Sequence, residues 1–222
     1  MLINTVAGLP LTIVATVVLA EHLGPDGFGR YATLLLVLPL VQSVTDLGVT
    51  NSLVQRGALA YGRGDNGGLR DLASLGFTWS LARWPLVLIV AFALMGPGWP
   101  LALYAVATGV TTSCAGVALV LISSIRIAEV SRVALLSSLA TAVVTIVATI
   151  VGTAPAGIFA AGMTAQAACL SAQIWVLSRE PLGLRGCFRI VALRGISSHL
   201  RFGLATFLGA QFAQLTTSRS EM

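Results

Sequence analysis

A succession of long apolar runs, separated by short connectors, is the feature that most constrains the fold of this chain. A helix needs about twenty apolar residues to cross the hydrocarbon core of a bilayer. Runs of this kind lie at roughly 2–20, 31–54, 74–95, 100–124, 133–152 and 156–177. A seventh begins near Phe202 and gives way to a polar tail at Thr216. The pattern predicts six membrane-spanning helices and part of a seventh.

The composition leads to the same class. Hydrophobic residues form 56% of the chain, charged residues 9%, and the mean hydropathy is +0.92. Soluble domains carry about 25% charged residues, so this chain is too poor in charge to cover a folded core with a solvated surface. The first apolar run has no basic region before it and no clear cleavage site after it, so it is expected to stay as a helix. We expect an all-α polytopic membrane protein.

The basic residues, all of them Arg, are distributed unevenly. With the N-terminus in the cytoplasm, the cytoplasmic connectors are those at about 55–73, 125–132 and 178–201. They hold ten of the thirteen Arg residues, whereas the opposite connectors hold only Arg30. Positive residues favour cytoplasmic loops. The distribution predicts a multi-pass protein of a bacterial plasma (inner) membrane with its N-terminus in the cytoplasm.

The longest basic connector, residues 178–201, has apolar residues between its charges. An amphipathic helix on the anionic inner leaflet fits this pattern, and a charged linker that only solvates the surface remains an alternative. The residues expected to face the lipid are Arg179, Arg185, Arg189, Arg194 and Arg201. Basic patches with interleaved aromatic residues are absent, so we expect no nucleic-acid partner.

Two charged residues, Asp46 and Arg83, lie well inside predicted spans. Asp46 precedes Arg56 by ten residues, or ~15 Å of helix, and Arg83 lies a comparable ~15 Å from the cytoplasmic start of the next span. Neighbouring antiparallel helices would place them at similar depth, as an ion pair or as part of a polar cavity. A purely structural pair stays open, as does an Arg83 that snorkels to the interface because its helix starts late.

Polar side chains surround Asp46 in the second span. Gln42, Thr45, Asp46 and Thr50 share one face by their spacing, with Asn51 beside them. A polar stripe on a membrane helix faces protein or water rather than lipid. We therefore place Gln42, Thr45 and Asn51 with Asp46 and Arg83 at a candidate substrate cavity.

Two short motifs resemble a known family. Residues 23–31 read LGPDGFGRY, and residues 46–48 read DLG. The residues that match are Leu23, Gly24, Pro25, Phe28, Gly29, Tyr31, Asp46, Leu47 and Gly48. This pattern resembles the opening of the oligosaccharide flippases of the multidrug/oligosaccharidyl-lipid/polysaccharide exporter superfamily, in which such a turn follows the first helix and such an element ends the second.

The resemblance implies a function and a division of the chain. The substrate would be a polyprenyl-pyrophosphate-linked oligosaccharide, with polysaccharide polymerase and glycosyltransferases as further partners. Arg83 would contact the pyrophosphate, Asp46 would orient Arg83 or sense a coupling ion, and Arg30 would lie near the outer rim. Family members have twelve to fourteen helices, so we expect a fragment: an N-terminal lobe (1–178), a basic linker (179–201) and an incomplete seventh helix (202–222).

Other functions are weighed against this one. They are a drug or cation antiporter of the same superfamily, a membrane-embedded transferase and a non-transporting assembly subunit. A transferase needs clustered acidic residues or histidines, whereas the acidic residues of the loops stand singly. Three isolated cysteines and two distant histidines predict neither a disulfide framework nor a metal site. We expect no cofactor and no enzymatic activity.

Overall fold

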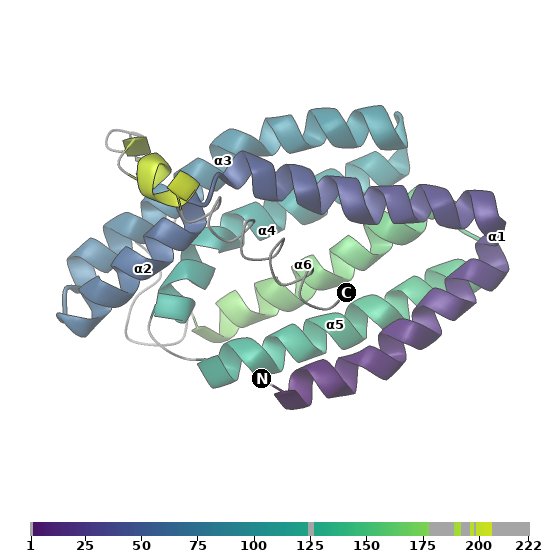
Figure 1. The fold of residues 1–222 in the computed structure, drawn as a ribbon, viewed down its shortest axis with the longest axis horizontal. Helices are drawn as coiled ribbons and strands as arrows, with labels where there is room; N and C mark the ends of the chain where they lie inside the picture. The colour runs from purple at the N-terminus through teal and green to yellow at the C-terminus, as the bar shows by residue number, and fades with distance from the viewer. Residues whose placement is uncertain (1, 124–126, 178–188, 192–195, 198, 206–222) are drawn as a thin grey trace, which may run out of the picture.

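The computed structural model describes residues 2–123, 127–177, 189–191, 196–197 and 199–205, and within these ranges it contains helices and turns but no strand. The helices pack side by side along the long axis of the molecule (Figure 1). Their bounds are α1 Leu2–Asp46, α2 Val49–Gly62, α3 Asn66–Met95, α4 Trp99–Ser123, α5 Ile127–Ile150 and α6 Pro155–Leu177. The all-helical class is as predicted.

Helix α1 consists of two arms that meet at a sharp bend. Gly24 has φ 65° and ψ 178°, a backbone conformation that is essentially restricted to glycine. Pro25 follows as the first residue of the second arm, a position for which its fixed φ suits it. The first arm (residues 2–23) lies beside α5, and the second arm (residues 25–46) returns along the molecule (Figure 1). The predicted turn is therefore confined to Gly24, and the rest of LGPDGFG is helical.

The predicted second span, 31–54, is not one continuous helix. The helix ends at Asp46, and α2 begins at Val49 as a separate helix. Leu47 has φ 49° and Gly48 has φ 71°, so two successive residues adopt left-handed backbone angles. This pair, which we call the α1–α2 break, ends the helical hydrogen-bond ladder. The residues from Val49 onward therefore do not continue the line of α1.

The other predicted helices are close to those observed, with earlier starts for two of them. Helix α3 begins at Asn66 rather than near 74, and α5 begins at Ile127 rather than near 133. The carboxylate of Asp65 caps α3 by accepting a 2.8 Å hydrogen bond from the N–H of Gly68, which satisfies a donor that the helix itself cannot. The connector predicted at 55–73 is therefore mostly helical.

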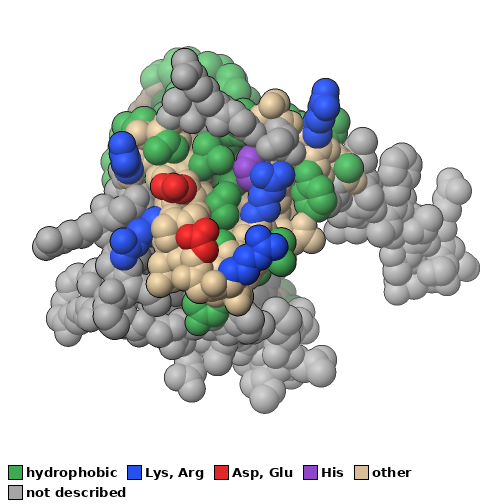
Figure 2. All heavy atoms as spheres, turned by 90° about the vertical axis from the view of Figure 1, so that its left-hand side faces the viewer, with side chains coloured by type: hydrophobic (Ala, Val, Ile, Leu, Met, Phe, Trp, Pro, Cys, Tyr) green, Lys and Arg blue, Asp and Glu red, His purple; other side chains and the backbone are tan. Residues whose placement is uncertain are grey.

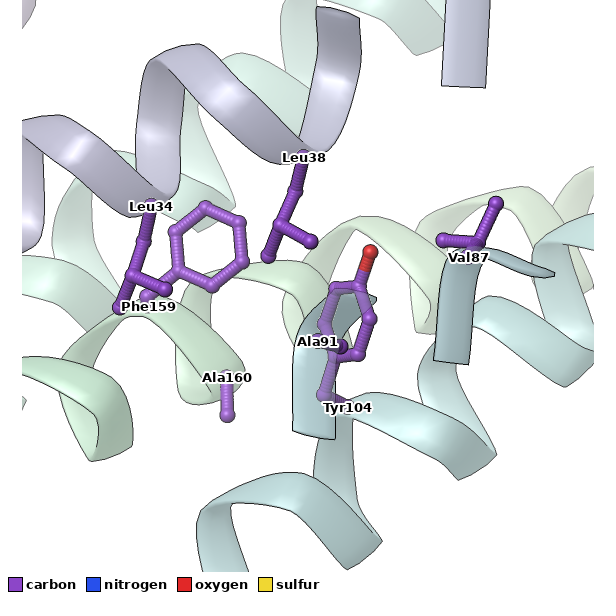
Figure 3. Packing of buried hydrophobic residues seen from close by; sticks show 7 residues of the cluster. All are labelled: Leu34, Leu38, Val87, Ala91, Tyr104, Phe159 and Ala160. Carbon is purple, nitrogen blue, oxygen red and sulfur yellow. The ribbon is translucent and has the colours of Figure 1, made fainter. Parts of the chain in front are cut away.

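The core lies where α1, α3, α4 and α6 meet. Its buried residues are Leu34, Leu38, Val87, Ala91, Tyr104, Phe159 and Ala160 (Figure 3). The rings of Tyr104 and Phe159 lie with their centroids 5.8 Å apart, a separation typical of favourable aromatic pairs. This cluster fixes the second arm of α1 against α3 and α4.

Apolar side chains also point outward. On the second arm, Leu38 is fully buried, whereas Leu36 is 70% exposed; Ile89 on α3 and Val106 on α4 are similarly exposed. Two stretches, Ile13–Asp46 and Asn66–Met95, are long and apolar enough to cross a membrane, by length and composition. Helices that are apolar on every side are typical of a membrane or a large core. The prediction of six spans stays a prediction.

Arginine side chains gather at one end of the molecule (Figure 2). This end is formed by α2, the start of α3 and the helical residues 199–205 (Figure 1). The exposed arginines of these elements are Arg56, Arg63, Arg70 and Arg201, and Arg189 of the basic linker is exposed as well. Of the basic linker, residues 189–191 are non-helical, which departs from the predicted amphipathic helix at that point. Arg179, Arg185 and Arg194 lie outside the described residues.

Candidate functional site

Asp46 and Arg83 form an ion pair at the α1–α2 break. Nη1 of Arg83 lies 3.0 Å from Oδ1 of Asp46, with side chains 22% and 16% exposed. The same Nη1 donates a 3.0 Å hydrogen bond to the backbone carbonyl of Gln42. That carbonyl belongs to the last turns of α1, where a cation is favoured by the helix dipole. The sequence placed these two residues at one depth, and the structure brings them into contact.

The Asp46 carboxylate also caps the first turn of α2. Its Oδ2 accepts from the N–H of Thr50 at 3.2 Å, and its Oδ1 accepts from the hydroxyl of Thr50 at 2.7 Å. Gly48 stands at the cap position of α2 but has no side chain to offer. A carboxylate close to the N-terminus of a helix is stabilised by the free N–H groups there. Asp46 therefore links Arg83 of α3 to α2 across the break.

The backbone at the break is strained. Leu47, a branched residue with a positive φ of 49°, is an uncommon case, and such a conformation costs on the order of 1–3 kcal/mol unless its surroundings enforce it. Glycine accepts the positive φ of Gly48 without this cost. Strain of this kind gathers at functional sites, and here it lies one residue from a partly buried ion pair.

The Arg83 guanidinium keeps donors that the described residues do not use. Arginine carries five N–H donors, and the contacts of Arg83 with described residues all pass through Nη1. Within the described part of the chain, the N–H groups on Nη2 and Nε are therefore not engaged by another residue. Two donors in one plane match two phosphate or carboxylate oxygens, so the pair can hold an oxyanion at its partly exposed edge.

Gln42 and Thr45 lie at this site with their side chains engaged locally. Nε2 of Gln42 donates to Oη of the buried Tyr104 at 3.3 Å, which ties α1 to α4. The Thr45 hydroxyl is directed at its own helix, toward the Val41 carbonyl at 2.7 Å. The predicted stripe that continues to Thr50 is not a single helical face, because the break intervenes. Thr50 reaches Asp46 as a helix cap instead.

Of the residues expected beside the ion pair, Asn51 does not reach it, and Arg30, expected near the outer rim, lies far from it. Asn51 is exposed on α2, beyond the break. Arg30 is exposed near the Gly24 bend, sixteen residues from Asp46 and hence ~24 Å away along the second arm. The site in this structure therefore consists of Asp46 and Arg83, with Gln42 and Thr50 supporting them.

An apolar groove of about 530 Å³ lies next to Trp84, the residue that follows Arg83. Its lining comes from α3, α4 and α6: Trp84, Ala105, Val106, Gly109, Val110, Ser113, Cys114 and Ser171. Nε1 of Trp84 donates to Oγ1 of Thr108 at 3.1 Å, so Thr108 forms an interhelical hydrogen bond. Among the described residues, no group of three or more His, Cys, Asp or Glu is placed to hold a metal ion.

The α1–α2 break and a histidine near it escaped sequence-based reasoning. A signal for the break exists: after Gly48 the chain turns polar, and Thr50 stands four residues from an aspartate that can cap it. His199 is buried against α2, and its Nδ1 lies 3.1 Å from Oγ of Ser52. A contact across 147 residues leaves no local pattern in the sequence.

Comparison with models of known protein families, with curated proteins and with solved structures finds no match to this chain.

Proposed function

We propose that this chain is the N-terminal lobe of a flippase that moves polyprenyl-pyrophosphate-linked oligosaccharides across a bacterial inner membrane. The observation that carries the proposal is the Asp46–Arg83 pair at a break in an otherwise apolar helix. An ionised residue within an apolar span is costly and marks a functional site by default. The family is inferred from the resemblance of the LGPDGFGRY and DLG motifs to those of the flippases.

The dimensions of the helices suit a bilayer. The second arm of α1, residues 25–46, is about 33 Å long, close to the ~30 Å thickness of a hydrocarbon core. Arg83 lies twelve residues before Met95, the last residue of α3, hence ~18 Å from the end of α3 opposite the arginine-rich one. With the arginine-rich end in the cytoplasm, the ion pair lies in the inner half of the membrane, where the lipid-linked substrate is loaded.

The chemistry of the pair suits a pyrophosphate. Asp46 and the Gln42 carbonyl hold one nitrogen of the guanidinium and offset its charge in a medium of low dielectric. The remaining N–H donors would bind two oxygens of a pyrophosphate with charge-assisted hydrogen bonds. The uncharged isoprenoid and sugar parts need no cation, so Arg83 is the residue that selects the pyrophosphate.

Lipid binding in nanodiscs tests this function. We expect the native chain to retain an undecaprenyl-pyrophosphate disaccharide at least tenfold more tightly than undecaprenol, measured by native mass spectrometry. Arg83→Gln should weaken the pyrophosphate lipid about tenfold, the equivalent of ~1.4 kcal/mol, and Arg63→Gln, on the exposed end of α2, should not. Equal retention of the two lipids by the native chain would exclude the proposed substrate. Preferred binding of tetraphenylphosphonium would favour the cation antiporter instead.

A further inference from the structure

His199 lies in a segment that docks on α2 from the far end of the chain. We call residues 196–197 and 199–205 the docking segment. Ile196 and Leu200 of this segment pack against the buried residues Val49 and Leu53 of α2. His199 itself is 5% exposed. The docking segment thus covers α2 where α2 begins.

The docking segment also touches the α1–α2 break. A Cβ built on Gly203 would lie 2.7 Å from the carbonyl oxygen of Leu47, and one built on Gly48 would collide with the Gly203 carbonyl. Two glycines therefore allow the backbones to meet directly. Because Asp46 precedes Leu47 in the chain, the docked segment lies against the same strained turn that positions the ion pair.

The contacts of His199 define its protonation state. Nε2 lies 3.3 Å from Nη1 of Arg56, and Nδ1 lies 3.1 Å from Oγ of Ser52. Arginine only donates, so Nε2 must accept and carries no proton. Nδ1 then carries the proton of the neutral ring and donates a hydrogen bond to the Ser52 hydroxyl. The docked arrangement requires a neutral His199.

A second proton on His199 would oppose docking. It would set an N–H on Nε2 against the N–H of Arg56 and place two cations 3.3 Å apart in a partly buried site. Burial and the Arg56 guanidinium lower the pKa of His199 below its ordinary value of 6.5. The undocked histidine regains the ordinary pKa, so it takes up a proton at a higher pH than the docked one. Docking is then unaffected well above pH 6.5 and weakens as the pH falls below it.

The charges of the surrounding elements do not offset that proton. The elements around His199 carry several charged residues. These are Arg56 and Arg63 at α2, Arg70 and Asp71 on α3, Arg201 on the docking segment, and Asp46 and Asp65 at the adjoining helix ends. Asp46 is engaged by Arg83 and Thr50, Asp65 caps α3, and Asp71 is exposed. Within the described residues no carboxylate forms an ion pair with His199. Figure 2 shows a histidine beside the arginines of this end, with the carboxylates to one side.

We propose that the docking segment is a proton-operated latch, which protonation of His199 releases from α2 and from the α1–α2 break. Release removes the Gly203 backbone from the strained turn and frees the linkage between Asp46 and α2. The latch therefore couples cytoplasmic acidification to the environment of the ion pair. The latch is inferred from the geometry around His199, and it does not depend on which ligand the ion pair binds.

Hydrogen–deuterium exchange of the full chain in nanodiscs tests the latch. His199→Gln offers a side chain that hydrogen-bonds and does not titrate, so comparing it with the native chain at each pH cancels the chemical pH dependence of exchange. We expect residues 199–205 to exchange at equal rates in both at pH 7.5. At pH 5.5 the native segment should exchange faster by up to about tenfold, the limit for one pH unit below 6.5. His22→Gln, which alters the exposed histidine of α1, is the matched control and should behave as native at both pH values.

A ratio of native to His199→Gln that stays near one at both pH values would overturn the proposal. If the His199→Gln variant fails to dock, fast exchange of residues 199–205 at pH 7.5 will reveal it. In that case the test uses the pH dependence of exchange in the native chain alone. Its protection factor in this segment should then fall between pH 7.5 and 5.5 while that of α4 stays constant. A constant protection factor in the segment would equally overturn the latch.

Discussion

The second arm of α1 and helix α2 are neighbours in sequence but differ in how apolar residues are distributed around the helix. The arm carries apolar residues on both its buried and its exposed side, as Leu38 and Leu36 show. In α2 the buried residues Val49, Ser52, Leu53 and Gly57 form one stripe, and the exposed residues are mixed, with Thr50, Asn51, Gln55 and Arg56 beside Leu59 and Tyr61. A helix that is apolar all round suits lipid, whereas an amphipathic one suits an interface. Two residues, Leu47 and Gly48, separate the two regimes.

The comparison teaches where a charge can be placed in such a chain. Asp46 ends the apolar helix and caps the amphipathic one, so it pairs with Arg83 and with a helix terminus at once. The cost of burying the aspartate is shared among Arg83, the Thr50 hydroxyl and the Thr50 N–H. A mid-helix aspartate would have had the first of these partners alone.

The largest expected effect comes from placing a charge on each helix in turn. Leu36→Arg puts a cation on the exposed side of the arm, and in a bilayer this costs on the order of 3–4 kcal/mol of insertion free energy. Asn51→Arg puts the same charge on the exposed face of α2 and should change insertion by less than ~0.5 kcal/mol. The membrane-inserted fraction after expression measures both. Equal insertion of the two variants would break the distinction between the helices.

A smaller effect is expected at the break itself. Gly48→Ala adds a Cβ at a left-handed residue, which costs about 1–2 kcal/mol, and the Cβ also collides with the Gly203 carbonyl. We expect a loss of roughly 2–3 kcal/mol in the free energy of unfolding. Gly62→Ala is the matched control, because nothing lies within 4 Å of its added Cβ. Thermal unfolding in detergent compares them, and an equal melting temperature for the two variants would contradict the close contact.

The smallest effect concerns the ion pair. A double-mutant cycle with Asp46→Asn and Arg83→Gln should give a coupling free energy of about 1–2 kcal/mol, since the pair is only partly exposed. The cycle of Asp46→Asn with Arg63→Gln should give a value near zero. Chemical denaturation of the four variants of each cycle provides the measurement. A near-zero coupling for Asp46 and Arg83 would show that the contact has no energetic weight.

The sequence was informative about elements and about one pair of charges. Hydropathy places α4 and α6 within one residue at each end, because connectors rich in Gly and Pro precede them and polar or charged residues follow them. The depth of Asp46 and Arg83 predicted their meeting, although the start assumed for the Arg83 helix was eight residues late. The apolar run that hydropathy detects begins only after Arg70 and Asp71, whereas helix α3 begins earlier in the chain, at its cap Asp65.

The rest depends on information that hydropathy does not carry. Leu47 and Gly48 fall inside the stretch that hydropathy assigns to a single span, so the break depends on backbone conformation and on the cap that Asp46 gives Thr50. The docking of His199 on Ser52 joins residues far apart in the chain and depends on how the helices are arranged. Asn51 is assigned to the site from its spacing alone, and it lies on α2 beyond the break, whereas Arg30, expected near the outer rim, lies near the Gly24 bend.

Accessibility of single cysteines in intact spheroplasts tests most directly the central claim, that the arm spans a membrane and α2 lies at its inner surface. The background replaces Cys114, Cys169 and Cys187 with alanine. A membrane-impermeant maleimide should label Asp26→Cys from outside, Gln55→Cys only after permeabilisation, and Leu36→Cys in neither case. Labelling of Gln55→Cys in intact spheroplasts, or of Leu36→Cys as readily as Gln55→Cys after permeabilisation, would contradict it.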